Sequence, residues 1–280
     1  MLTLTAQLPP HLGGLSRPSI YISTEAPLST RRLLQINATL SSICDYSTPP
    51  PPSTDRVFSI TCSDLESQEH IIRYQLPVMV EKCNVGLIVI DSVAANFRSE
   101  FERPGVKRLK TAASVATLSP PTAAATPAPP GGQMAMRGYD MVRLAQTLRS
   151  LAVNHNLAVV VSNQVSDKFS PAPSFFSPSP GDDDDDPMSL DFQSRWFTGC
   201  DDQGKIPALG LVWANLVATR IVVRKREDPR TGEWRRGIAV VYSPTAQPSG
   251  ECPFEIFEGG VRTATPQVFG PVGDGDKEDR

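Results

Sequence analysis

An apolar run followed directly by a carboxylate constrains the fold of this chain more than any other feature. Residues 87–90 read Leu-Ile-Val-Ile and are followed by Asp91 and Ser92. An uninterrupted apolar run is typical of a strand that is buried on both faces of a parallel sheet. Open α/β sheets bind their ligands at the carboxyl ends of such strands. Asp91 is therefore a candidate ligand of hydrated Mg²⁺, and capping of the next segment is the alternative.

Strands and helices alternate over the first two thirds of the chain. Apart from 87–90, strands are predicted at Ile20–Thr24, Val57–Thr61 and Leu157–Val161. Helices are predicted from Pro27, from the capping box of Ser63 and Glu66, and in the region after Met136. Later strands follow each other directly, at 219–223, 238–242 and 254–257. We therefore predict an α/β fold with a mainly parallel central sheet flanked by helices, and antiparallel strands at its C-terminal edge.

Two long stretches contain few residues that could form a core. Residues near 105–135 are mostly Ala, Pro, Thr and Gly, and residues 169–205 are rich in Pro and Ser and include five aspartates in a row at 182–186. Such compositions predict disordered insertions. Residues 265–280, with Pro, Gly and charge, predict a flexible tail. The domain prediction is one core over residues 1–264 that both insertions interrupt.

The composition excludes several classes of protein. The five cysteines form no C-x-x-C pair and the three histidines are scattered, which argues against a disulfide framework or a zinc site. No run of about 18 apolar residues occurs and no signal-like segment begins the chain, so we expect a soluble, intracellular protein without a membrane partner. The formal net charge of −3 provides no overall attraction to nucleic acid.

Three of the predicted strands end in polar residues that could act together. These residues are Glu25, Asp91 and Gln164, and in a parallel sheet their strand ends lie at one edge. A nucleotide-hydrolysing site uses a carboxylate near Mg²⁺, a second carboxylate that activates water, and an amide that senses the terminal phosphate. The alternative for each residue taken singly is a helix cap or a loop anchor.

Several short segments resemble a known family. They are Tyr21–Glu25, Arg32-Leu33, Leu87–Ser92, Val159–Val165 and Pro207–Gly210. In these segments the chain resembles the RecA-type recombinase superfamily, and within it the eukaryotic recombinase paralogues that include a fungal recombination-mediator subunit and its vertebrate X-ray-repair counterpart. The resemblance covers most of residues 15–262 outside the insertions. It implies a RecA-like P-loop ATPase core.

The resemblance also implies roles for individual residues. Asp91, followed by Ser92 in the cofactor-binding segment, resembles the Walker B aspartate that holds Mg²⁺ through water. Glu25 resembles the catalytic glutamate that activates water, and Gln164 resembles the glutamine that links nucleotide state to the second DNA-binding loop. The implied cofactors are ATP and Mg²⁺.

Two arginines have a family role and an alternative. Arg32 resembles the arginine that packs on adenine, and the alternative is a solvated helix arginine. Arg98 lies where the first DNA-binding loop of the family begins, and the alternative is an exposed surface charge.

The sequence departs from the family pattern in two respects that bear on function. The phosphate-binding loop, Gly-x-x-x-x-Gly-Lys-Thr/Ser, does not occur in the 280 residues. Residues 1–10 resemble the end of the helix that follows this loop, so we expect the first strand and the loop to be encoded upstream. The aspartates at 182–186 fall in the second DNA-binding loop, where they would repel a phosphate backbone, although a solvated acidic loop is the simpler interpretation.

The function that the resemblance implies is that of a nuclear recombination-mediator subunit. Such a subunit would bind ATP, pair with another RecA-like paralogue as a heterodimer, and assist the main recombinase filament on single-stranded DNA in double-strand-break repair. Two alternatives stay open. The chain could be a non-catalytic scaffold with a dead nucleotide site, or a DNA-dependent ATPase that acts by itself.

Overall fold

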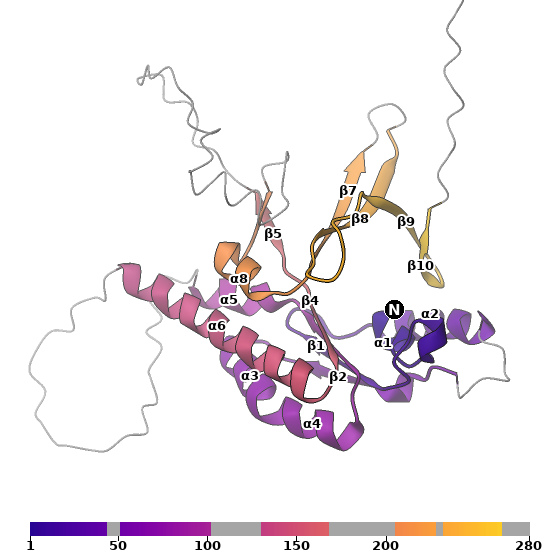
Figure 1. Ribbon diagram of the computed structural model, residues 1–280, viewed down its shortest axis with the longest axis horizontal. Helices are drawn as coiled ribbons and strands as arrows, with labels where there is room; N and C mark the ends of the chain where they lie inside the picture. The colour runs from indigo at the N-terminus through magenta and orange to yellow at the C-terminus, as the bar shows by residue number, and fades with distance from the viewer. Residues whose placement is uncertain (44–50, 102–129, 168–204, 228–231, 265–280) are drawn as a thin grey trace, which may run out of the picture. The chain divides into compact units, whose positions relative to one another are not determined.

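The computed structural model describes residues 1–43, 51–101, 130–167, 205–227 and 232–264 (Figure 1). The chain divides into two compact units, Met1–Val217 and Ala218–Arg280, and each is considered by itself. Most of the two predicted insertions and the whole predicted tail lie outside the described residues. Residues 130–135, which fall in the range of the first predicted insertion, belong to a helix. Within the described ranges, no helix combines the length and the apolar character needed to cross a membrane.

A four-stranded parallel sheet forms the centre of the first unit. Its strands are β1 (Ser19–Ser23), β2 (Val57–Thr61), β3 (Leu87–Asp91) and β4 (Ala158–Val161), in the order β2-β1-β3-β4. β1 therefore pairs with β2 on one side and with β3 on the other, and β4 pairs with β3. This arrangement confirms the predicted α/β class and brings the carboxyl ends of all four strands to one edge.

Helices lie between successive strands of this sheet, as the alternation predicted, and others precede β1 or follow β4. They are α1 (Leu2–Thr5), α2 (Thr30–Ile43), α3 (Leu65–His70), the π-helical turn η3 (Ile71–Gln75), α4 (Leu76–Cys83), α5 (Val93–Phe101), α6 (Pro130–Asn154) and α8 (Gly210–Leu216), with 3₁₀ turns η1 (Pro10–Leu12) and η2 (Thr54–Arg56). A short antiparallel pair, β5 (Val165–Asp167) and β6 (Lys205–Pro207), follows β4.

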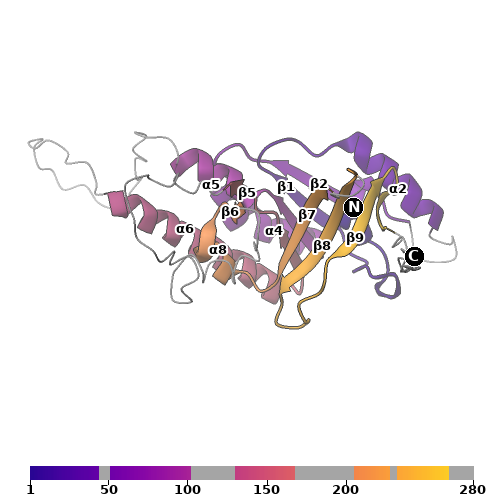
Figure 2. The ribbon, with the colours of Figure 1, turned by 90° about the horizontal axis from the view of Figure 1, so that it is seen from above.

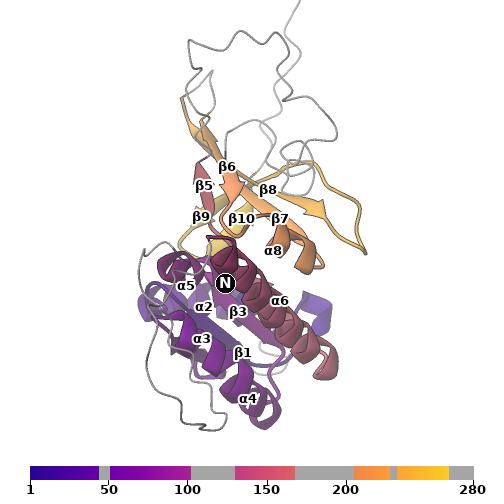
Figure 3. The same ribbon diagram turned by 90° about the vertical axis from the view of Figure 1, so that its left-hand side faces the viewer.

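The central strands are covered on both faces. Alternate residues of β1 and β3 point to one face, where they join a large core with residues of α3, α4, α5, α6 and α8. Figure 3 shows α3, α4 and α6 beside β1 and β3. Buried members of this core include Ile20, Ile22, Ile88, Ile90, Val80, Phe97, Leu148 and Trp213. A smaller cluster contains Leu4 of α1 and three residues of α2, namely Leu33, Ile36 and Leu40. The hydroxyl of Ser19, which lies on the other face of β1, donates to the carbonyl oxygen of Thr3 at 2.9 Å, so α1 lies against that face.

The second unit is an antiparallel sheet. Its strands are β7 (Arg220–Glu227), β8 (Trp234–Tyr242), β9 (Cys252–Phe257) and β10 (Gly260–Thr263), which pair in the order β10-β9-β8-β7. Figure 2 shows β7, β8 and β9 side by side. The predicted antiparallel pairing of the C-terminal strands is thus confirmed. The strands form a sheet of their own rather than the edge of the parallel sheet, and the sequence did not predict β10.

Three predicted helix starts differ from the structure. The helix expected at Pro27 begins at Thr30, because residues 24–29 form the loop that leaves β1. The residue that caps α3 is Asp64 rather than Ser63, since the Asp64 carboxylate accepts from the backbone N–H of Ser67 at 2.7 Å. The helix expected after Met136 begins at Pro130.

Candidate functional site

The ends of β1 and β3 are joined by a reciprocal set of hydrogen bonds. The backbone N–H of Thr24 donates to the carbonyl oxygen of Asp91 at 2.9 Å. The Thr24 hydroxyl donates to the carbonyl oxygen of Ser92 at 2.7 Å and accepts from the N–H of Ser92 at 3.0 Å. Because Thr24 and Ser92 are both buried, these bonds fix the point at which the chain leaves each strand. Glu25 and Asp91, which neighbour them, are exposed at the same edge.

Both carboxylate oxygens of Asp91 accept a hydrogen bond from a hydroxyl group. The Tyr21 hydroxyl on β1 donates to Oδ2 at 2.6 Å. The Ser162 hydroxyl, directly after β4, donates to Oδ1 at 2.5 Å. Burial raises the pKa of Tyr21 well above its usual range, and the hydrogen bond to Asp91 and its negative charge add to this effect. Tyr21 therefore carries its proton at neutral pH and serves as a donor.

Glu25, Gln164 and Arg98 form a second chain of contacts. The amide nitrogen Nε2 of Gln164 donates to Oε1 of Glu25. The amide oxygen of Gln164 accepts from Nη1 of Arg98 at 3.3 Å. Gln164 thus connects the carboxylate that follows β1 to α5, the helix that follows Asp91.

A cavity of about 490 Å³ opens beside these carboxylates. Its walls come from α1, the end of β1, the start of α2 and the end of β3, and its lining includes Tyr21, Glu25, Arg32, Val89 and Asp91. This volume lies within the range of small-molecule sites, roughly 300–1,000 Å³. The structure therefore brings Glu25, Asp91 and Arg32 to one cavity, and it brings Gln164 and Arg98 to Glu25 through hydrogen bonds.

The place of Ser92 differs from that of the other predicted site residues. Its side chain is buried, and within the described part of the chain its hydroxyl has no hydrogen-bond partner. Its backbone, in contrast, makes the two bonds to Thr24. In this structure, then, Ser92 contributes to the shape of the β3 exit through its main chain.

The donor set at this edge fits a hydrated Mg²⁺ ion. Mg²⁺ keeps several water ligands and is bound through one or two carboxylates together with substrate phosphates. Asp91 has this character, because it is exposed and its orientation is fixed by hydroxyl donors. Across the ranges that the structure describes, no three His, Cys, Asp or Glu side chains lie close enough to ligate a metal ion without other groups.

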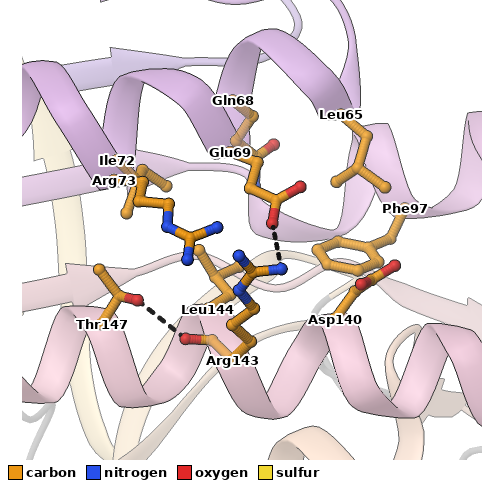
Figure 4. Close-up of a pocket in the computed structure, with 10 residues that line it drawn as sticks. All are labelled: Leu65, Gln68, Glu69, Ile72, Arg73, Phe97, Asp140, Arg143, Leu144 and Thr147. Atoms are coloured by element: carbon orange, nitrogen blue, oxygen red, sulfur yellow. Dashed lines mark hydrogen bonds and ion pairs between the residues drawn. The ribbon is translucent and has the colours of Figure 1, made fainter. Parts of the chain in front are cut away.

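A second, smaller recess lies among the helices of the first unit (Figure 4). Its lining comes from α3, η3, α5 and α6, with apolar side chains such as Phe97 and Leu144, and an ion pair at 3.5 Å joins Glu69 to Arg143. None of the site residues that the sequence predicted lines this recess.

Sequence reasoning did not identify Tyr21, Thr24 or Ser162 as site residues. Tyr21 occupies the middle of a strand, where an aromatic residue is ordinary. Ser162 is a hydroxyl residue directly after an apolar strand, but the sequence does not show that this strand lies beside the one that carries Asp91. Only the strand order shows that both residues flank Asp91.

The fold and the edge residues define the class of protein. A parallel sheet flanked by helices carries the predicted residues at its carboxyl edge, and residues 1–116 match the Rad51 family model. The chain therefore carries a Rad51 family domain with a RecA-like fold.

The relatives specify the class further. The chain is 39% identical over 255 residues to the DNA repair protein rhp57 of Schizosaccharomyces pombe, a match that covers 88% of this chain and 64% of that protein. It is 32% identical over 169 residues to RAD57 of Saccharomyces cerevisiae, covering 60% of this chain and 30% of that protein. It is 26% identical over 268 residues to XRCC3 of Bos taurus, a match that covers 93% of this chain and 63% of that protein. The homologues are thus RecA-type recombinase paralogues, and the chain spans less than two thirds of the length of each.

Proposed function

We propose that this chain is a nucleotide-binding recombination-mediator subunit of the RecA-like family. It would assist assembly of the recombinase filament on single-stranded DNA during repair of double-strand breaks by homologous recombination. One observation carries the proposal: Glu25 and Asp91 line one cavity, and Gln164 contacts Glu25, in a chain whose relatives are named DNA repair proteins.

The side chains suit distinct tasks around a bound nucleotide. Asp91 would hold Mg²⁺ through water, and Mg²⁺ when bound neutralises charge on the phosphates. Glu25 would accept a proton from an attacking water molecule. Its contact with Gln164 would make the position of this carboxylate depend on α5 through Arg98. Arg32, which lines the cavity, would pack on the base.

The proposed partners follow from the net charge of the chain and from the proteins to which it is related. The net charge of −3 favours action on DNA within a complex rather than by this chain singly. We propose another RecA-like paralogue as its heterodimer partner, the main recombinase filament as its target, and the nucleus as its place of action. Because the 280 residues contain no phosphate-binding loop motif, we expect a polypeptide of these residues only to bind ATP weakly.

Photolabelling of the native assembly tests the proposal. The protein is produced from its native gene, with any coding sequence that lies upstream of residue 1, and carries an affinity tag. It is recovered from host nuclei with its bound partners and labelled with 8-azido-ATP and Mg²⁺. We expect a second RecA-like protein in the preparation and label on the tagged subunit. Asp91→Asn should reduce Mg²⁺-dependent labelling about tenfold, the usual cost of disturbing a metal site. Glu25→Gln should leave labelling intact while slowing hydrolysis at least about 10²-fold, the usual contribution of a general base.

A matched substitution separates these effects from a general loss of charge. Glu81 is exposed on α4, and Glu81→Gln should change neither labelling nor hydrolysis. Label on the partner only would favour the non-catalytic scaffold. Absence of any RecA-like partner would contradict the mediator proposal and favour a DNA-dependent ATPase that acts by itself.

A further inference from the structure

We propose that Tyr21 and Ser162 are positioning residues for Asp91, and that their hydroxyls orient its carboxylate toward a hydrated divalent cation that binds with the nucleotide. The inference rests on the proposed nucleotide-binding function and deepens it. Neither residue contacts the reacting atoms under this proposal. Both act through Asp91.

The strand order makes this arrangement possible. β3 lies between β1 and β4, so each neighbouring strand can supply one donor to the residue at the end of β3. Tyr21 on β1 reaches Oδ2 at 2.6 Å, and Ser162 after β4 reaches Oδ1 at 2.5 Å. These lengths are those of charge-assisted O–H···O⁻ bonds, about 2.5–2.7 Å. The two oxygens of the carboxylate are thus held from opposite sides.

The donors are themselves fixed. The backbone N–H of Ser162 donates to the carbonyl oxygen of Ile90 at 2.9 Å, and its own carbonyl oxygen accepts from the N–H of Val93 at 3.0 Å. Tyr21 is paired with Val89 in the sheet register, and its side chain lines the same cavity as Asp91. A rotation of the Asp91 carboxylate would break both hydroxyl bonds.

The carboxylate still has capacity for a ligand. An ionised carboxylate has about four lone-pair sites, and the two hydroxyls use two of them. The remaining sites can accept hydrogen bonds from metal-bound water. Substitution of groups that orient a metal ligand typically costs 10- to 100-fold in metal affinity. Because the Tyr21 and Ser162 hydroxyls both orient Asp91, we expect the loss of either hydroxyl to lower the affinity for Mg²⁺ about tenfold.

The experiment measures labelling of this subunit by 8-azido-ATP in the native assembly, with Mg²⁺ and with EDTA. Tyr21→Phe should reduce Mg²⁺-dependent labelling about tenfold and leave metal-free labelling unchanged, because the phenyl ring still fills its place. Ser162→Ala should behave in the same way, whereas Ser162→Thr keeps the hydroxyl and should retain labelling. Tyr74→Phe is the matched control, because Tyr74 is 58% exposed on η3 and does not line the cavity.

A double substitution tests whether Tyr21 acts through Asp91. In an Asp91→Asn background, Tyr21→Phe should cause no further loss. An equal loss in both backgrounds, or no loss in the single variant, would overturn the inference while the nucleotide site stands. Loss of metal-free labelling as well would indicate a purely structural role and would also overturn it.

Failure of the proposed function would look different. Wild-type protein would then show no more Mg²⁺-dependent labelling than Asp91→Asn. In that event the urea midpoints of the wild type, the two single variants and the double variant decide the inference. If Tyr21→Phe shifts the urea midpoint only when Asp91 is present, the positioning contact is supported. Equal shifts of the midpoint in the wild-type and Asp91→Asn backgrounds would overturn it.

Discussion

At the scale of single residues, Arg17 has the most consequential contacts outside the candidate site. Its guanidinium donates to the carbonyl oxygens of Asn84 at 3.0 Å, Asn156 at 2.7 Å and His155 at 3.3 Å. These carbonyls follow the C-terminal ends of α4 and α6, and cationic groups are favourable there because helix ends leave carbonyls unsatisfied. Arg17 therefore links, through hydrogen bonds, the turns that lead into β3 and β4, at the sheet edge opposite Asp91.

Removal of this side chain should be costly. We expect Arg17→Ala to lower the free energy of unfolding by about 2–3 kcal/mol, since hydrogen bonds of a charged group contribute about 1.5–3 kcal/mol. Urea denaturation followed by circular dichroism measures the change. Arg31→Ala is the control, because Arg31 is exposed on α2 and surface substitutions usually stay within about 0.5 kcal/mol. Equal midpoints for the two variants would contradict the role of Arg17.

The candidate site shows which residues a sequence can indicate. Glu25, Asp91 and Gln164 could be predicted as candidates because each lies at or just after the end of a predicted strand and because their order resembles a family pattern. Tyr21 and Ser162 could not, because their importance depends on the lateral order of strands that are far apart in sequence. Periodicity shows where a strand ends, but it does not show which strands are neighbours.

At the scale of secondary-structure elements, the strands of the parallel sheet were predicted more accurately than the helix starts. In the second unit, β7 continues to Glu227 and β8 begins at Trp234, so both are longer than the predicted 219–223 and 238–242. The predicted strand Val57–Thr61 coincides with β2, and Asp91 ends β3 as expected. The apolar run 87–90 determines β3, whereas β2 has an alternating pattern and is only partly buried. Helix starts depend instead on which of several adjacent polar side chains reaches a free backbone N–H. Ser63 and Asp64 are both acceptable caps by type, and only geometry selects Asp64.

The cap of α3 gives a pH-dependent prediction. Hydrogen bonds from the backbone and the hydroxyl of Ser67 lower the pKa of Asp64 below its usual value of 3.8. A carboxyl with a lowered pKa stabilises the fold above its usual pKa, and this stabilisation is lost as the pH falls through the lowered value. Asp64→Ala should therefore lower the free energy of unfolding by about 1 kcal/mol at pH 7.

The difference in free energy of unfolding between wild type and Asp64→Ala should decrease as the pH falls below about 4, where carboxyl groups of ordinary pKa become protonated. Urea midpoints between pH 7 and pH 3 measure it. Ser63→Ala, at the position that the sequence favoured, should change the midpoint less at every pH. A larger effect at Ser63 would restore the original capping-box interpretation.

At the scale of the whole molecule, buried apolar residues are distributed very unevenly. Both core clusters belong entirely to the unit Met1–Val217. Among the described residues of the second unit, Ala239 is the only buried hydrophobic residue. A four-stranded sheet with so little buried apolar surface lacks the main source of folding free energy. The contact of Lys225 with the Trp234 ring, at 4.2 Å, adds only about 0.5–1 kcal/mol at an exposed site.

The two units should consequently behave differently when they are separated. We expect a fragment of residues 1–217 to unfold in one cooperative transition, because it keeps the parallel sheet and both clusters. A fragment of residues 218–264 should show no cooperative transition, since a sheet needs a packed apolar face for independent stability. Thermal melts of each fragment followed by circular dichroism measure both outcomes. A cooperative melt of the C-terminal fragment would show that its sheet is stabilised by contacts other than those described. Absence of a transition in residues 1–217 would mean instead that the parallel sheet carrying Glu25 and Asp91 depends on the second unit to fold.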